Sequence, residues 1–403
     1  MGAVLVQHVV VVELAVLLVA LPLATRRAWL IPGVVAAAVL LVAVLPRYRG
    51  RRFVLWPGIV LAFRRRRRQA SALQRQRAAQ NRAPQQGTSP DPDADLAPVR
   101  EVAPNLVVEA VTDRTRRPIG LVGDGTFLTA VLLVEAPDEP LRPRRARHPL
   151  PLATIAEALR LDDVVLASAQ IVQVSQPAPA PHLPPESPAA RSYVELRERE
   201  GLDVPAVRQT WIALRLDRDQ CATAVAARGG GHEGAQRTVM RAANKLAAML
   251  ADDGLSCRIL DEQGLRQALF VASGVNPAVR RTGRGGLRTV EARHTWRCDD
   301  RWHTTFWISR WPRLTGPSTP DLIGALTGTP GLATTFSLTA QSGGAGSVAL
   351  TGHVRISARS ADELERAASA LEARAGQLRV GVVRLDWEQQ PGLVATLPLG
   401  GQS

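Results

Sequence analysis

Two long apolar stretches near the start of the sequence limit what the first fifty residues can form. Residues 4–21 are mostly Val, Leu and Ala, and residues 28–45 contain no charged side chain. As a helix, each stretch is about 27 Å long, close to the roughly 30 Å hydrocarbon core of a bilayer. The short connection between them, which carries Arg26 and Arg27, makes the two helices antiparallel. The sequence therefore predicts a hairpin of two transmembrane helices.

A cleaved signal peptide is the alternative for the first stretch. It fits poorly, because residues 1–7 carry no positive charge and a second apolar stretch follows at once. Arginines set the orientation of the hairpin: two lie in the connection and nine follow the second stretch, namely Arg47, Arg49, Arg51, Arg52, Arg64, Arg65, Arg66, Arg67 and Arg68. By the positive-inside rule, both termini and everything after the hairpin are expected in the cytoplasm.

The basic flank of the hairpin contains a third apolar piece, residues 53–63, which is too short to span a bilayer. We expect it at the level of the lipid headgroups, with a short core helix or strand as the alternative. The nine flanking arginines are expected to contact anionic lipid; contact with a partner protein or with nucleic acid is the alternative. Inside the first apolar stretch, Glu13 is a candidate for a contact between membrane helices, and a proton pathway is the alternative.

The positive charge of the chain is concentrated at one end. The net charge of the 403 residues is +14, of which +11 belongs to residues 1–100 and +3 to the rest. This distribution argues against nucleic-acid binding by the main body. Lys245 is the only lysine, and no P-loop motif is present. Three cysteines are too few for a disulfide framework and agree with a reducing compartment.

Composition divides the chain into five expected segments. They are a transmembrane hairpin with its basic juxtamembrane segment (1–68), a linker (69–101), a small mixed α/β subdomain (102–176), a Pro-rich linker (177–190) and an α+β cytoplasmic domain (191–398). In the small subdomain we expect strands at 105–112, 118–123, 126–135 and 164–174, and a helix at 152–161. In the larger domain we expect strands at 209–216 and 255–260, and helices at 219–228, 233–253 and 261–272.

From residue 304 onward the expected order is β-α-β-β-α-β. The strands are 304–311, 333–341, 347–358 and 378–385, and the helices are 320–326 and 361–375. This order is the split βαβ or ferredoxin-like pattern. The predicted fold class is therefore two N-terminal transmembrane helices followed by an α+β cytoplasmic region with ferredoxin-like elements.

Motifs for catalysis or metal binding are weak. His294, Cys298 and His303 lie within ten residues, but a fourth ligand is missing and Trp296 and Trp302 crowd the stretch, which favours a packed strand turn. We expect no catalytic residue, metal or cofactor. Trp302, Trp307 and Trp311 lie in or next to one predicted strand, with Trp307 and Trp311 expected on the same side. They are candidate docking aromatics, and a wholly buried cluster is the alternative.

A family resemblance rests on residues 209–269, QTWIALRLDRDQ to DEQGLRQAL, followed by HTTFWISRWP at 303–312 and combined with the apolar hairpin and its basic flank. Together they resemble EccE, a membrane component of the type VII (ESX) secretion system of actinobacteria. The resemblance implies a non-enzymatic structural subunit of an inner-membrane complex, with EccB-, EccC- and EccD-like partners. ATP would be hydrolysed by the EccC-like partner.

Two other functional classes remain open at this point. One is a membrane-tethered enzyme of transferase type, and the other is a membrane-bound regulator that binds nucleotide or nucleic acid. The lead hypothesis expects membrane lipid and other secretion subunits as partners, with no nucleic acid and no small-molecule substrate.

Overall fold

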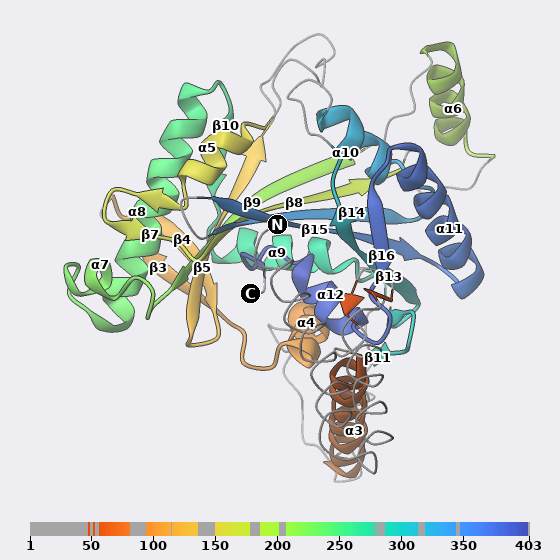
Figure 1. The fold of residues 1–403 in the computed structure, drawn as a ribbon, viewed down its shortest axis with the longest axis horizontal. Helices are drawn as coiled ribbons and strands as arrows, with labels where there is room; N and C mark the ends of the chain where they lie inside the picture. Colours follow the sequence, from red (N-terminus) through yellow and green to blue (C-terminus); the bar gives the residue numbers. More distant parts are fainter. Residues whose placement is uncertain are drawn as a thin grey trace, which may run out of the picture. The chain divides into compact units, whose positions relative to one another are not determined.

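A computed structural model describes residues 47–48, 51–52, 56–80, 94–113, 115–135, 150–177, 186–200, 207–276, 279, 287–312, 319–343 and 347–401 (Figure 1). The chain divides into two units, Met1–Ala72 and Leu73–Ser403. In the first unit, strands β1 (Arg47–Tyr48) and β2 (Arg51–Arg52) pair with each other, and helix α3 (Trp56–Gln80) begins.

The second unit contains two halves with the same order of elements. The N-half consists of β3 (Val107–Thr112), β4 (Pro118–Gly123), β5 (Phe127–Glu135), α5 (Leu152–Glu157), β8 (Ser168–Gln176), β9 (Val207–Asp217), α8 (Gly231–Asp252), β10 (Ser256–Ile259) and α9 (Glu262–Ser273). The C-half consists of β11 (Thr289–Glu291), β12 (Trp296–Cys298), β13 (Arg301–Arg310), α10 (Thr319–Thr327), β14 (Ala333–Ser342), β15 (Val348–Ala358), α11 (Ala361–Gln377), β16 (Gly381–Arg384) and α12 (Gln389–Ala395).

Shorter elements connect or extend the halves. Before β3 lie η3 (Ala94–Leu96) and α4 (Ala97–Val102). Within the N-half are the small hairpin β6 (Arg160–Leu161) and β7 (Val164–Val165), and the helices α6 (Pro188–Glu200) and α7 (Ala222–Ala226).

Twelve described strands of the two halves form one antiparallel sheet, while β6 and β7 pair only with each other. The N-half pairs its strands in the order β10-β5-β9-β8, and the C-half in the equivalent order β16-β13-β15-β14. Both are the order of a split βαβ unit. The halves join where β8 pairs with β14, with Val172 opposite Ser337. Because β8 and β14 are equivalent strands that run antiparallel, an approximate two-fold axis near this residue pair relates the halves.

Alternating side chains of the strands enter two different cores. Leu128, Ala130 and Leu132 of β5 point to face 1 of the sheet, which α5, α8, α10 and α11 cover. Phe127 and Val131 of the same strand point to face 2, which α4, α9, α12 and the residues after α12 cover. Figure 1 shows α5 and α8 over the N-half, and α10 and α11 over the C-half.

Helix α9 illustrates how local sequence sets the element ends. The Asp261 side chain accepts a hydrogen bond from the backbone N–H of Gly264 at 2.7 Å and caps the first turn. Gly274, with φ +71°, ends the helix in the left-handed conformation. Between these ends, Leu265, Leu269 and Ala272 recur at helical spacing and are buried on face 2.

Polar side chains fill the centre of face 2, where they bind the C-terminal ends of α9 and α12, the last helix of each half. Arg355 of β15 is completely buried and donates to the carbonyl oxygens of Ala272 and Ser273, the last residues of α9. In the opposite direction, Gln170 of β8 and Ser337 of β14 both donate to the carbonyl oxygen of Ala395, the last residue of α12, at 2.9 Å.

The predicted transmembrane part of the fold class is corrected by the structure. Residues 4–21 and 28–45, and with them Glu13, lie outside the described residues. Of the helices that the structure does describe, none is both long and apolar enough to cross a membrane. The longest is α3, and its five consecutive arginines, Arg64–Arg68, place cations all round more than one helical turn. The described chain is instead a mixed α+β fold on one large antiparallel sheet.

Element predictions for the second unit are confirmed from residue 304 onward. The predicted β-α-β-β-α-β order corresponds to β13, α10, β14, β15, α11 and β16, with ends that agree within a few residues. The Pro-rich segment 177–190 lies between β8 and β9, which pair directly with each other, so the sheet is continuous across it. Residues 69–80, within the expected linker, are the end of α3.

Arg355 allows a stability prediction. Arg355→Met removes the donors to two buried carbonyl oxygens, so we expect the free energy of unfolding to fall by about 3 kcal/mol. Urea titration followed by circular dichroism measures this loss. The control is Arg359→Met, an exposed arginine just beyond the end of the same strand, which should change the free energy by less than about 0.5 kcal/mol. Equal losses in the two variants would contradict the role of Arg355.

His303 allows a prediction of pH dependence. Its ring is completely buried, its Nδ1 lies 2.8 Å from the Ser357 hydroxyl, and burial and then Arg355 hold its pKa well below the usual value. The folded chain keeps this ring neutral, whereas the unfolded chain takes up a proton near pH 6.5. Stability from this group is therefore present above about pH 6.5 and declines below it, by about 1.4 kcal/mol between about pH 7.5 and about pH 5.5.

The measurement for His303 compares urea midpoints at the two pH values in the unaltered chain and in His303→Gln. Gln does not titrate, so the loss of stability on acidification should be smaller in the variant by about 1.4 kcal/mol. An identical loss in both proteins would show that His303 does not contribute to the acid sensitivity.

Candidate docking site

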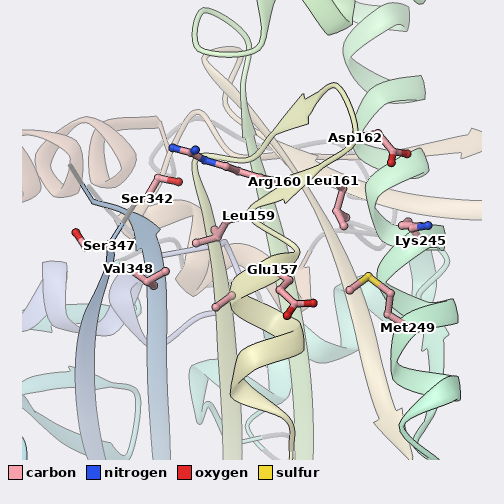
Figure 2. A pocket seen from close by; sticks show the side chains of 11 residues that line it. Glu157, Leu159, Arg160, Leu161, Asp162, Lys245, Met249, Ser342, Ser347 and Val348 are labelled. Carbon is pink, nitrogen blue, oxygen red and sulfur yellow. The ribbon is translucent and has the colours of Figure 1, made fainter. Parts of the chain in front are cut away.

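A cavity of about 460 Å³ opens on face 1, and three separate parts of the chain line it (Figure 2). We call it the hairpin pocket. Its walls include Leu159 and Leu161 at α5 and β6, Lys245 and Met249 of α8, and Ser342 and Val348 at the tip of the β14–β15 hairpin. The pocket thus lies where helices of the N-half meet a hairpin of the C-half.

Ion pairs hold the β6–β7 wall of the pocket against the neighbouring helices. In the turn of this hairpin, Asp162 has φ +54° and its carboxylate lies 3.0 Å from the Arg241 guanidinium. Asp163 receives two hydrogen bonds from Arg228, at 2.7 and 2.8 Å, which lower the pKa of its carboxyl to about 2. Asp163 therefore stays ionised at neutral pH, and the two aspartates fix the turn to α8 and to Arg228, just after α7.

Three exposed charged residues of the hairpin pocket remain available to a ligand. Arg160, Lys245 and Glu157 line it, and their side chains form no ion pair or hydrogen bond with the residues that the structure describes. Leu159, Leu161 and Met249 supply apolar surface beside them. A partly apolar lining with a few unpaired charges suits a protein segment that carries an aliphatic and a charged side chain.

Exposed apolar side chains extend the pocket along β15. Val348 and Leu350 are each 41% exposed, although they point to the same face as Val354 and Ile356, which α11 buries. The start of β15 therefore continues face 1 beyond the part covered by helices. Uncovered aliphatic side chains beside a cavity are typical of protein interaction sites.

The three predicted docking tryptophans lie in different surroundings. Trp302 is half-buried, with the Arg297 guanidinium 5.4 Å above its ring. Trp311 is also half-buried: it meets the ring of Phe336 edge-on at 6.5 Å and lies against Gly352, where a Cβ atom would come within 2.3 Å of it. Both pack on the face 1 core, whereas Trp307 points to face 2. The expectation that Trp307 and Trp311 share a side is wrong, because the strand is irregular after Ile308.

The predicted lipid-facing arginines fall in the first unit. Arg47 lies in β1, Arg51 and Arg52 in β2, and Arg49 outside the described residues. In α3, Arg64, Arg65, Arg67 and Arg68 are exposed and Arg66 is half-buried. The guanidinium of Arg67 lies 5.8 Å from the centre of the Phe63 ring. Helix α3 therefore presents four exposed cations within two turns.

The packed-turn interpretation of His294, Cys298 and His303 is confirmed. His303 lies beside Trp296, with ring centres 5.0 Å apart, and the Nδ1 of His294 lies 2.8 Å from a carboxylate oxygen of buried Asp386. Burial raises the pKa of the Cys298 and Cys257 thiols, the latter to about 11. Neither is therefore a thiolate at neutral pH. No cluster of metal-ligating side chains occurs among the described residues.

Sequence reasoning noted Lys245 as the only lysine but assigned it no role. The hairpin pocket was missed because its walls come from residues 156–162, 245–249 and 342–348, which no local pattern connects. One signal was available: the alternation of apolar residues on β15 extends back to Val348 and Leu350.

Comparison with known proteins finds a match to a family model over part of the chain. Residues 204–308 match the family model described as the type VII ESX secretion system translocon protein EccE. The matched part runs from just before β9 to near the end of β13, and includes Lys245, Met249, Trp302 and Trp307. No curated protein matches the chain. The resemblance to EccE inferred from the sequence is confirmed over these residues.

Val348 and Leu350 form the exposed lip of the hairpin pocket. Substitutions there should affect stability less than a substitution at a buried position of the same strand. The double variant Val348→Ser, Leu350→Ser should change the free energy of unfolding by less than about 1 kcal/mol, because both side chains already contact water. It should also reduce the fluorescence of bound anilinonaphthalene sulfonate. As control, Val354→Ser, at a buried position of the same strand face, should cost more than about 2 kcal/mol. Unchanged dye binding in the double variant would show that the lip is not an accessible apolar surface.

Proposed function

We propose that this chain is a non-enzymatic structural subunit of a type VII protein secretion complex at the bacterial inner membrane. The observation that carries the proposal is the match of residues 204–308 to EccE, a translocon component. The matched residues contain β9 and β10 of the N-half and β11, β12 and most of β13 of the C-half, so the match includes parts of both halves, whereas β8, β14 and β15 at the centre of the sheet lie outside it.

On this proposal, the arginines of α3 contact anionic lipid on the cytoplasmic side of the membrane. Four of Arg64–Arg68 are exposed, and each basic residue near an anionic surface contributes about 1 kcal/mol of attraction. Most of the net positive charge lies in residues 1–100, so the main sheet carries little of it. Three free cysteines agree with the reducing cytoplasm.

The second unit then acts through protein contacts. Its partners would be EccB-, EccC- and EccD-like subunits, with ATP hydrolysis left to the EccC-like protein. The hairpin pocket and the adjoining Val348 and Leu350 offer an apolar surface with unpaired charges. Trp302, Trp307 and Trp311 remain candidates for a second contact, because each is only half-buried.

A structural role is also supported by the chemistry of the described side chains. The half-buried and buried thiols of Cys257 and Cys298 are protonated at neutral pH. The Asp386 carboxylate, which could orient a catalytic histidine, also accepts a hydrogen bond from Arg384 at 3.1 Å and ties the turn before β12 to the end of β16. These groups serve packing rather than nucleophilic attack.

Isolation of the chain from membranes tests the proposal. A tagged chain, extracted with a mild detergent, should co-purify with an EccC-like ATPase and an EccD-like multispan protein. The variant Val348→Asp, Leu350→Asp should reduce recovery of at least one partner about tenfold, because a carboxylate in an apolar contact costs more than about 1.4 kcal/mol.

The matched control is Val107→Asp, at a 58% exposed position on β3 at the far edge of the sheet, which should leave recovery unchanged. Purification of the unaltered chain without any secretion subunit would refute the function. Equal recovery with the β15 variant would refute only the place of docking.

A further inference from the structure

A buried segment crosses face 2 after the end of α12. Every residue from Gly392 to Gly401 is buried, although only the first four belong to the helix. We call Thr396–Gly401 the strap. It leaves the C-half and lies across the strands β8, β9 and β5 of the N-half, where its hydrogen-bond partners are found.

Side chains of the sheet recognise the main chain of the strap. The Leu399 carbonyl accepts from the Thr129 hydroxyl at 2.9 Å, and the Gly401 carbonyl accepts from the Arg215 guanidinium at 2.8 Å. At Gly400, the N–H donates to the Gln170 side-chain oxygen at 2.8 Å and the carbonyl accepts from the Ser168 hydroxyl. Four side chains from three neighbouring strands therefore hold three consecutive peptide groups.

Apolar contacts fix the register of the strap. Leu397 is completely buried and Leu399 is 3% exposed, and both belong to the face 2 core with Val172 and Ala213. Pro398 stands between them and has no N–H, so this buried segment has one donor fewer that would need an acceptor. The two leucines stand on either side of the proline in a segment that bends through Leu397–Gly400, with the Leu399 N–H donating to the Leu397 carbonyl at 2.8 Å.

Two glycines complete the fit. Gly400 has φ +88° and Gly401 has φ +80°, a backbone conformation that favours glycine. A Cβ atom on Gly400 would lie 2.4 Å from the Cβ of Arg215, and one on Gly401 would lie 2.6 Å from the Thr339 side chain. The groove thus admits Gly-Gly at this point and excludes any larger pair.

We propose that this groove is a peptide-binding site for a bent Leu-Pro-Leu-Gly-Gly segment, filled here by the strap of the same chain and able to bind that segment when it is supplied in trans. Polar side chains that bond to the main chain of the strap, buried contacts for two leucines and a glycine-selective end are the features of a peptide-recognition groove. The proposal is independent of the secretion role, because it concerns face 2 and the strap alone.

The test uses the full-length chain with the strap expelled. In Leu397→Asp, Leu399→Asp the two carboxylates cannot enter the face 2 core, while the groove residues stay unaltered. A fluorescent peptide with the sequence of residues 395–403, ATLPLGGQS, is titrated and its anisotropy measured. We expect saturable binding with a Kd of about 10 μM or below, and binding at least tenfold weaker to the unaltered chain, whose own strap competes at high effective concentration.

A matched peptide provides the control, with alanine in place of both glycines. It should bind the variant chain at least tenfold more weakly, because the groove cannot accept the added Cβ atoms. If the variant chain is unfolded on its own, the readout is its thermal melting: the native peptide should restore a cooperative transition and the alanine peptide should not. Absence of both binding and restored folding, or equal effects of the two peptides, would overturn the proposal.

Discussion

The fold depends on an exchange in which each half holds the last helix of the other. The final carbonyl groups of a helix have no partner within it, so a buried helix end needs donors from elsewhere. Arg355 of the C-half supplies them to α9, and Gln170 of the N-half, with Ser337, supplies them to α12. Burial lowers the pKa of Arg355 to about 9, so the guanidinium is still protonated at neutral pH and suits the negative end of the α9 dipole. Besides this exchange, the halves are joined by the β8–β14 ladder and by the strap, which bonds to side chains of β5, β8 and β9.

This arrangement gives the two faces of the sheet different roles. Face 2 has a polar centre, and its side chains are committed to the helix ends and the strap. Face 1 has an aliphatic core under separate pairs of helices, and it is left incompletely covered where the β14–β15 hairpin reaches the N-half. A contact made at the hairpin pocket would therefore leave the polar layer of face 2 undisturbed. Docking on this side is compatible with a rigid sheet, whereas insertion on face 2 would have to displace buried hydrogen bonds.

Most helices and strands of the second unit could be predicted from the sequence, because apolar periodicity and turn residues are local signals. The pairing of β8 with β14 and the equivalence of the two halves could not be predicted, because they depend on contacts between distant residues. Arg355 looks like an outward polar residue of an alternating strand, and only the helix across it makes it a buried one. At the start of the chain, apolar content alone predicted the hairpin, but the described helix nearest to it, α3, combines apolar and cationic turns. For the docking site, local patterns indicated the tryptophans but not the pocket, whose walls are brought together by the sheet.

A small difference between the halves explains why the strap exists. Leu260 and Leu385 occupy equivalent places, since each donates its N–H to the strand beside it, to Val131 and Thr305 respectively at 2.9 Å. The aspartates that follow act differently: Asp261 caps α9, whereas Asp386 binds His294 and Arg384, and α12 begins without a side-chain cap. Helix α9 has 12 residues and reaches Arg355 on the opposite half, but α12 has only 7 and stops at the central strands. The strap, which is not helical, covers more of the N-half face. Since the carbonyls of Leu399, Gly400 and Gly401 and the Gly400 N–H have no helical partners, the sheet supplies Thr129, Ser168, Gln170 and Arg215 to bind them.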